Sequence, residues 1–320
     1  MEHRHEQSVL KQPSITEDSA AWTEYWQKKG QLWRTEPEID RNRQVFLAMR
    51  LATIPDVAQG TYPFKGVKLS RADIEWLLAT YEDNRGFVDH KDESQRKRIG
   101  LDLRGADLRQ LNLAGLPLAH MRGGLNRKER TELATTLEQW EMASVHLEGA
   151  TLFETHLEGA DLFHAHLEGA NLYRAHLEGT YFKEAHLEGT ILIRAHLEGA
   201  WLIKTHLEKA NFREAHLEGS SLREAHLEGA ILHEAFFDSA TNLRNVALGN
   251  EKVGFALLAD VRWGGANLAV VKWSQIKVLG DEYIARQKRS STAELKEKKV
   301  RLEEYQAAVR ANRQLSLIHI

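Results

Sequence analysis

Cysteine is absent from the 320-residue chain, which excludes disulfide bonds and any zinc site built on thiolates. The N-terminal residues Met1–Gln7 lack the apolar core of a secretory signal peptide. No apolar run approaches the ~18 residues that a membrane-spanning helix needs. These absences favour a soluble protein with no membrane segment, and we expect it in the cytoplasm.

Sequence signatures of common enzymes are also missing. The chain has no P-loop, no G-x-G-x-x-G and no H-E-x-x-H motif. Histidine and glutamate, which serve in acid–base catalysis, are abundant, but they recur as repeated pairs with no pocket and no distinct nucleophile beside them. We therefore expect a protein that is not an enzyme, with no catalytic residues and no bound cofactor.

A five-residue repeat is the main feature that the sequence does contain. Residues 145–239 hold 19 consecutive units in one frame, centred on Leu or Phe from Leu147 to Phe237. A small residue stands two places before each centre; Val145 is the exception. A helix needs apolar residues three and four apart and a strand needs them two apart, so a strict five fits neither. It fits a square coil, in which each unit forms one side and one corner and the small and large apolar residues point inward.

The repeat units carry a resemblance to a known family. Ala160–His164, Ala170–Arg174 and Ala266–Val270 follow the pattern A-(D/N)-L-x-x, which resembles that of pentapeptide-repeat proteins. The resemblance covers residues 101–280 and implies a mainly β fold, a right-handed quadrilateral β-helix with four units per coil. It says little about function, because one fold hosts many unrelated roles.

Helical segments are expected before the repeats. Residues 1–15 are predicted to be a disordered tail and residues 16–98 a helical module. The first helix lies near 17–29, with Trp22, Tyr25 and Trp26 on one face. A capping-box pattern at Thr35–Glu38 predicts a second helix running toward Ile54, and a similar signal at Ser70–Asp73 predicts a third.

Two further helices are expected within and after the repeats. The repeat frame stops after His120 and resumes at Val145, so residues 121–144 are predicted to be a helical insertion, with Leu133, Leu137 and Trp140 on a helical spacing. Past Ser239 the frame slips and becomes irregular. Residues 281–320 are predicted to contain a C-terminal helix. Because Ser316–Ile320 resembles translated adapter sequence, we expect the natural chain to continue further.

The repeat also predicts columns of histidine on two opposite walls. One coil takes 20 residues, so residues that far apart should stack at the inter-strand spacing of about 4.7–4.9 Å. The candidate pH-sensitive columns are His146, His166, His186, His206 and His226 on one wall, and His156, His176, His196 and His216 on the other. Glutamates two places later form parallel columns.

These columns have several readings. They can be a solvated wall produced by repeat duplication, a pH-responsive or partner-binding surface, or a metal site. A flat ladder converges on no point whereas zinc demands convergence, so no metal site is expected. Carboxylates favour protonated histidine and crowding of imidazoles opposes it, which leaves the sign of the pKa shift open.

The remaining two walls place large apolar side chains outward, where a plain surface would be polar. Neighbouring outward aromatic and isoleucine residues can form an interface patch, or the N-terminal helices can fold back and cover it. The candidate interaction surface consists of Phe153, Phe163, Tyr173, Tyr181, Ile193, Trp201 and Ile203.

These observations together predict a scaffold that binds an unidentified protein partner. Residues 145–239 carry 16 acidic against 7 Lys and Arg residues, a balance of −9. Direct nucleic-acid binding is not expected, because phosphate neutralisation needs Lys and Arg. Two alternatives remain open: a DNA mimic that binds gyrase or another topoisomerase, as some similar proteins do, and the soluble front part of a longer, membrane-associated protein. A homodimer is also an open alternative.

Overall fold

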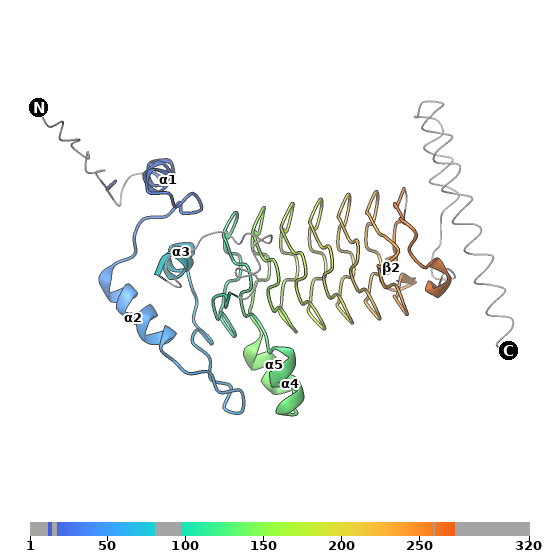
Figure 1. The fold of residues 1–320 in the computed structure, drawn as a ribbon, viewed down its shortest axis with the longest axis horizontal. Helices are drawn as coiled ribbons and strands as arrows, with labels where there is room; N and C mark the ends of the chain where they lie inside the picture. The colour runs from blue at the N-terminus through green and yellow to red at the C-terminus, as the bar shows by residue number, and fades with distance from the viewer. Residues whose placement is uncertain (1–11, 15–17, 81–97, 259, 273–320) are drawn as a thin grey trace, which may run out of the picture.

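The computed structural model describes residues 12–14, 18–80, 98–258 and 260–272, and Figure 1 shows a row of stacked coils with helices at one end and on one side. The expected tail at 1–15, apart from residues 12–14, lies outside the described residues. So do all of residues 81–97 and the expected C-terminal helix at 281–320.

The repeats form a four-sided coil whose rungs pair in parallel. Within residues 146–236 the bridged residue of each unit pairs with the residue 20 positions later, as in His166 with His186 and Tyr181 with Trp201. The backbone N–H of Leu167 donates to the carbonyl oxygen of His186 over 2.7 Å, so Leu167 and Leu187 are neighbours on successive coils, as the spacing predicts. The parallel ladder thus follows from the repeat of five, because four units return the chain to the same wall.

The interior of the coil is filled by the two inward residues of each unit. Leu167, Phe182 and Phe212 are fully buried, and so are the small residues stacked beside them, such as Ala165 and Ala185. Burial of about 25 cal/mol per Å² of apolar surface makes this column of leucine and alanine the main source of stability.

The corners of the coil are tight turns with positive φ. The N–H of Ala150 donates to the carbonyl oxygen of Leu147 over 3.0 Å, and Gly149 between them has φ of +64°. Lys209 replaces glycine at such a corner and adopts the left-handed region with φ of +61°. It is not exceptional, because corners on the two walls without a histidine column are left-handed with ordinary residues, for example Arg194 at +57°.

Three helices precede the coil: α1 (Ser19–Lys28), α2 (Arg41–Leu51) and α3 (Arg71–Thr80). The predicted face of Trp22, Tyr25 and Trp26 on α1 is buried. The expected capping box at Thr35 is wrong. α2 begins after Asp40, which caps it. The N–H groups of Thr35 and Glu36 donate instead to the buried carboxylate of Glu75 on α3, which draws this segment away from a helical start.

The helical region covers the first coil. Ile74 and Leu77 of α3 are fully buried in the same core cluster as Leu101 and Leu103. In the segment before α3, Lys68 forms a parallel bridge with Asp107. The edge of the first coil is therefore hydrogen-bonded at this place. An unpaired strand edge invites association with other chains, so this cover protects the N-terminal end of the solenoid.

The insertion between the first coil and the long run contains two short helices, α4 (Arg127–Glu132) and α5 (Leu137–Ala143), where one was expected. Each has its own capping box, from Asn126 with Glu129 and from Thr136 with Gln139. The second capping box starts a new helix at Leu137, so Leu133 and Leu137 do not share one helical face, and both are exposed.

The last coils are irregular. A hairpin of β1 (Gly249–Asn250) and β2 (Gly254–Phe255) interrupts the frame after Ser239. The unit Ala266–Val270, expected as another coil side, forms a 3₁₀ helix, η3 (Leu268–Val270), because the Asn267 side chain caps it by accepting from the N–H of Ala269. Within the described residues, none of the helices combines the length and apolar character needed to cross a bilayer.

Candidate functional site

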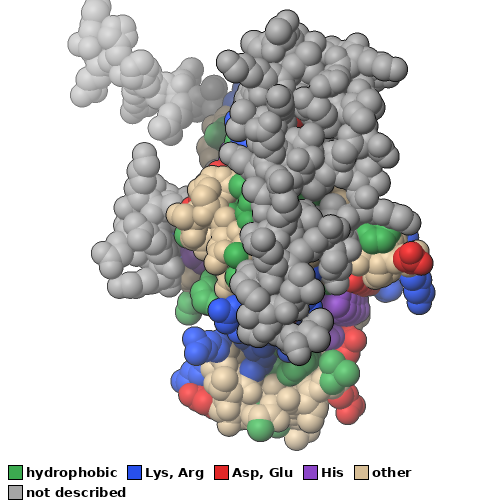
Figure 2. All heavy atoms as spheres, turned by 90° about the vertical axis from the view of Figure 1, so that its right-hand side faces the viewer, with side chains coloured by type: hydrophobic (Ala, Val, Ile, Leu, Met, Phe, Trp, Pro, Cys, Tyr) green, Lys and Arg blue, Asp and Glu red, His purple; other side chains and the backbone are tan. Residues whose placement is uncertain are grey.

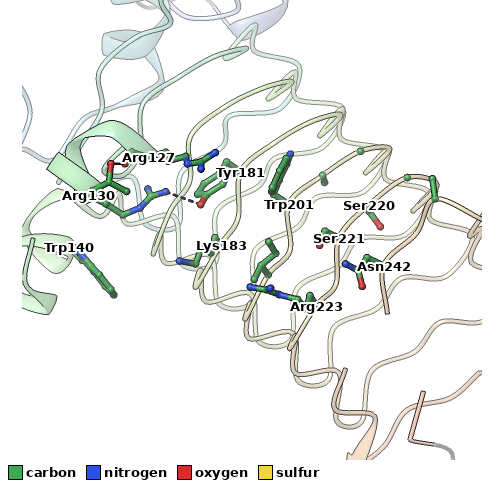
Figure 3. Close-up of a pocket in the computed structure, with 16 residues that line it drawn as sticks. Arg127, Arg130, Trp140, Tyr181, Lys183, Trp201, Ser220, Ser221, Arg223 and Asn242 are labelled. Atoms are coloured by element: carbon green, nitrogen blue, oxygen red, sulfur yellow. Dashed lines mark hydrogen bonds between the residues drawn. The ribbon is translucent and has the colours of Figure 1, made fainter. Parts of the chain in front are cut away.

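A groove runs between the insertion and one wall of the coil. We call this wall the Trp201 wall; its rungs include Tyr181, Trp201, Ser221 and Asn242. The groove has a volume of about 950 Å³, and its walls come from α4, α5 and four successive rungs. Figure 3 shows Arg127 and Arg130 from α4 at one end, with the rung residues following along the coil.

Positive side chains dominate the polar lining of this groove. Arg127, Arg130, Lys183 and Arg223 line it, and none of the 16 lining residues is Asp or Glu. Lys183 and Arg223 each have a sequence neighbour as ion-pair partner, Glu184 at 3.3 Å and Glu224 at 3.5 Å. Such partly exposed pairs contribute roughly 0–1 kcal/mol, so a bound anion can compete for these cations.

Arg130 is held firmly between the insertion and the coil. Its guanidinium carbon lies 3.9 Å from the ring centre of Phe163 and 4.9 Å from that of Tyr181. The same group donates to the Tyr181 hydroxyl over 2.8 Å and to the carbonyl oxygen of Leu125. Arg130 is therefore a fixed positive end of the groove.

Aromatic rings form the floor beyond Arg130. The Trp201 side chain is 49% exposed, and its ring centre lies 6.1 Å from that of Tyr181 on the preceding rung. Gly199 and Gly219 form the adjacent corners, and a Cβ added to Gly199 would meet no atom within 4 Å. The groove thus combines an open aromatic surface with positive charge.

The structure separates the seven residues of the predicted interaction surface. Tyr181, Trp201 and Ile203 line the groove. Phe153, Tyr173 and Ile193 lie on the opposite wall, where the rings of Phe153 and Tyr173 stack at 5.5 Å. Phe163 was expected to be exposed, and this is wrong: it is 1% exposed and packs edge-on against Trp140 at 5.0 Å. The cover is the insertion rather than the N-terminal helices.

The histidines form the two expected columns. Successive imidazoles lie parallel, as for His166 and His186 at 4.9 Å and His196 and His216 at 5.1 Å between ring centres. The second column ends in a stacked phenyl ring, since Phe236 lies 4.4 Å from His216. Figure 2 shows histidine side chains on both flanks of the coil.

Each imidazole pairs with the glutamate two residues later. The distance from Nδ1 to Oε1 ranges from 2.7 Å for His156 and Glu158 to 3.6 Å for His226 and Glu228. This attraction raises the pKa of His176 and His186, and Glu168 and Glu141 together raise the pKa of His166 to about 9. For these three, carboxylate attraction outweighs the crowding of imidazoles, which resolves the sign that the sequence left open.

His164 belongs to neither column and behaves differently. It stands at a corner of the Trp201 wall, is 7% exposed, and has its pKa lowered by burial. The repeat pattern did not point to this histidine or to the groove residues Arg127, Arg130, Lys183 and Arg223. The sequence does mark His164 as unusual, because the same corner of later coils holds Glu or Lys.

The stacked five-residue rungs define the class of protein: a solenoid built as a four-sided β-helix. A family model described as pentapeptide repeats matches residues 141–179, 170–208 and 207–246, with 8 copies. A solved pentapeptide repeat protein (Rfr23) from the cyanobacterium Cyanothece 51142 is 30% identical, with 47% of this chain and 92% of that chain covered and a TM-score of 0.22. The chain belongs to the pentapeptide-repeat family.

Two other solved structures are similar at lower identity. HetL, a pentapeptide repeat protein involved in heterocyst differentiation regulation from the cyanobacterium Nostoc sp. strain PCC 7120, is 20% identical over 62% of this chain and 92% of that chain, with a TM-score of 0.21. Full-length QnrB1, a plasmid-mediated fluoroquinolone resistance protein, is 16% identical over 60% and 87%, with a TM-score of 0.23. No curated protein matches the sequence. These two similarities carry no information about activity.

Proposed function

We propose that this protein is a non-enzymatic scaffold whose groove binds an acidic segment of a partner protein. One observation carries the proposal: four cations and an exposed tryptophan line the groove, and no carboxylate does. An extended peptide with acidic side chains and one aromatic or aliphatic side chain complements both features. Arginine and tryptophan are residue types enriched where binding energy concentrates in interfaces.

The surroundings of the groove favour a short acidic peptide over a nucleic acid. Glu198 and Glu218 immediately precede the corner glycines at one edge, and Glu184 and Glu224 stand beside Lys183 and Arg223. A continuous phosphate backbone has one charge per nucleotide and would meet these carboxylates along its length. A peptide can place its few carboxylates at the cations alone.

A topoisomerase-binding DNA mimic is the second candidate. The balance of −9 in residues 145–239 favours it, because a DNA-binding surface attracts acidic rods. The nine glutamates of the columns each have an imidazole beside them, which offsets part of that charge where the imidazole is protonated. The third reading, the front part of a longer membrane-associated protein, stays a prediction.

A binding measurement with a defined probe tests the groove. Fluorescence anisotropy would use a labelled peptide of glutamates around one tryptophan, with a lysine peptide and single-stranded oligonucleotides as comparison probes. We expect the acidic peptide to bind the full chain. Arg127→Glu and Arg223→Glu should each weaken binding at least about tenfold, equivalent to ~1.4 kcal/mol.

The opposite wall supplies matched controls. Arg213 occupies the same position of its unit as Arg223 and pairs with Glu214 at 3.3 Å, so Arg213→Glu makes the same charge change outside the groove. Ile191 similarly matches Trp201 in its unit. Arg213→Glu and Ile191→Ala should leave affinity unchanged, whereas Trp201→Ala should reduce it. Equal effects on both walls, or tighter binding of the oligonucleotides, would refute the proposal. Gyrase binding that Arg223→Glu does not weaken would support the mimic instead.

A further inference from the structure

The insertion brings a third ligand type to the end of one histidine column. Glu141 of α5, His164 and His166 each offer one ligand atom, and these atoms all lie within 4.8 Å of one another. Groups along the columns, such as His186, Glu188 and His206, meet the same spacing, but all their members lie on one flat wall. Here Glu141 approaches from α5 and His164 from a corner of the coil. The insertion and the coil therefore meet at this place.

The spacing of two of these atoms suits a metal ion directly. Nε2 of His166 lies 3.1 Å from Oε2 of Glu141. Two ligands of a tetrahedral zinc ion with bonds of about 2.0–2.1 Å lie roughly 3.4 Å apart. A zinc ion between these atoms replaces the hydrogen that Nε2 donates to the carboxylate, and that proton leaves to solvent.

Hydrogen bonds behind both histidines orient them as ligands. The Ser144 hydroxyl donates its one hydrogen to the carbonyl oxygen of Trp140 over 2.8 Å. Nδ1 of His164, 3.3 Å from the Ser144 oxygen, must then carry the hydrogen of that contact, which leaves the lone pair on Nε2. Nδ1 of His166 lies 3.2 Å from Glu168 Oε1. A metal-binding histidine usually donates its other ring N–H to a carboxylate, a backbone carbonyl or water; here the Glu168 carboxylate and the Ser144 hydroxyl occupy those places.

We propose that Glu141, His164 and His166 bind a zinc ion, with the remaining coordination position open to water or to a group from a partner. Two imidazoles and one carboxylate are a ligand set typical of such open zinc sites. The ion would tie α5 to the coil beside the buried ring pair of Trp140 and Phe163. The proposal is independent of the peptide groove.

Calorimetric titration of the chelator-treated full chain with Zn²⁺ alone tests the site. We expect one equivalent of Zn²⁺ to bind tightly to the chain. Glu141 is half exposed, so Glu141→Gln removes a ligand without disturbing the core and should weaken binding at least tenfold. Ser144→Ala should weaken it about 10–100-fold, the usual effect of losing a contact behind a ligand. Loading with Co²⁺ should give the visible absorption of a tetrahedral site.

Two matched variants separate this site from the bare ladder. Glu138→Gln makes the same change one turn earlier on α5, and His206→Gln removes an imidazole from the column away from the insertion. Both variants should still bind one equivalent of Zn²⁺ with unchanged affinity. The proposal is overturned if Glu141→Gln binds within twofold of the unaltered chain, or if His206→Gln weakens binding as much as Glu141→Gln does.

Discussion

Backbone strain at single residues recurs around the whole coil. The corner position has positive φ whether it holds Gly189 at +67°, Arg194 at +57° or Lys209 at +61°. A residue with a Cβ in this region costs roughly 1–2 kcal/mol, while glycine loses about 0.5–1 kcal/mol through its greater freedom in the unfolded chain. The fold therefore tolerates ordinary residues at these corners because pairing on both sides holds them.

Lys209→Gly should stabilise the protein by about 0.5–1 kcal/mol, because the backbone strain that it removes exceeds the cost of the greater freedom that glycine gives the unfolded chain. Urea denaturation would measure the change. Gly189→Ala is the reciprocal variant: no atom lies within 4 Å of the added Cβ, so only the backbone strain is tested, and it should destabilise. Loss of stability in Lys209→Gly would show that the lysine side chain, and not its backbone, decides this corner.

Glu178→Gln should lower the pKa of His176 toward the ordinary value of about 6.5. The Glu178 carboxylate, 3.6 Å from Nδ1, is the largest cause of the raised pKa, with Glu158 adding to it. Because the folded pKa lies above the unfolded one, the pair stabilises the fold fully below about pH 6.5 and loses that effect as the pH rises through the raised pKa.

An NMR titration of the His176 ring protons gives this pKa directly. Replacement of Glu188, on the other histidine wall, is the control and should leave the His176 titration unchanged. An unaltered titration in Glu178→Gln would mean that Glu158 and Glu154, and not Glu178, raise the pKa of His176.

At the scale of elements, charged contacts attach the insertion to the first coil. Arg104 is fully buried and pairs with Asp102 at 2.6 Å and with Glu129 of α4 at 2.9 Å. Glu129 also caps α4 and pairs with Arg122 at 2.7 Å. These contacts place α4 over the Trp201 wall, and the groove depends on that placement.

Arg104→Met should destabilise the protein by about 3 kcal/mol, because it removes a buried charge from two partly buried carboxylates, Asp102 and Glu129, and leaves them with fewer contacts. The next unit offers a matched control. Arg109 pairs with Asp107 in the same Asp-Leu-Arg pattern at 2.8 Å, but its side chain is 55% exposed. Arg109→Met should change the free energy of unfolding by only about 0–1 kcal/mol. Similar losses in both variants, measured by denaturation, would contradict the role assigned to burial.

At the scale of the molecule, stability is a sum over neighbouring rungs. Deletion of residues 186–205 joins Ala185 to His206 and removes one complete coil while keeping every column in register. We expect this protein to fold and to unfold cooperatively. Deletion of residues 186–202 removes 17 residues and puts the later units out of frame, so it should expose the C-terminal rungs to protease. Equal protease resistance of the two deletion variants would contradict the claim that the five-residue spacing sets the register of the rungs.

The sequence by itself determined the coil. Large apolar residues recur every five positions, as in Leu187 and Leu192, and a small residue stands two places before each. No helix or plain strand buries both sets, so the wall and the column of each residue could be predicted by counting. The buried face of α1 and the cap of α3 were also predictable, because each depends on residues within one or two turns.

Only the tertiary structure decided what lies on the coil. Phe163 and Tyr173 occupy equivalent outward positions, and nothing local shows that α5 covers one and leaves the other half-buried. His164 and Glu141 are 23 residues apart, and their meeting depends on how the insertion packs, which a repeat pattern does not encode. The same holds for Thr35. Its N–H was expected to bond within a local cap, but it donates to the carboxylate of Glu75, which is distant in sequence. Short-range periodicity fixes the coil, whereas contacts between segments far apart in sequence fix the surface.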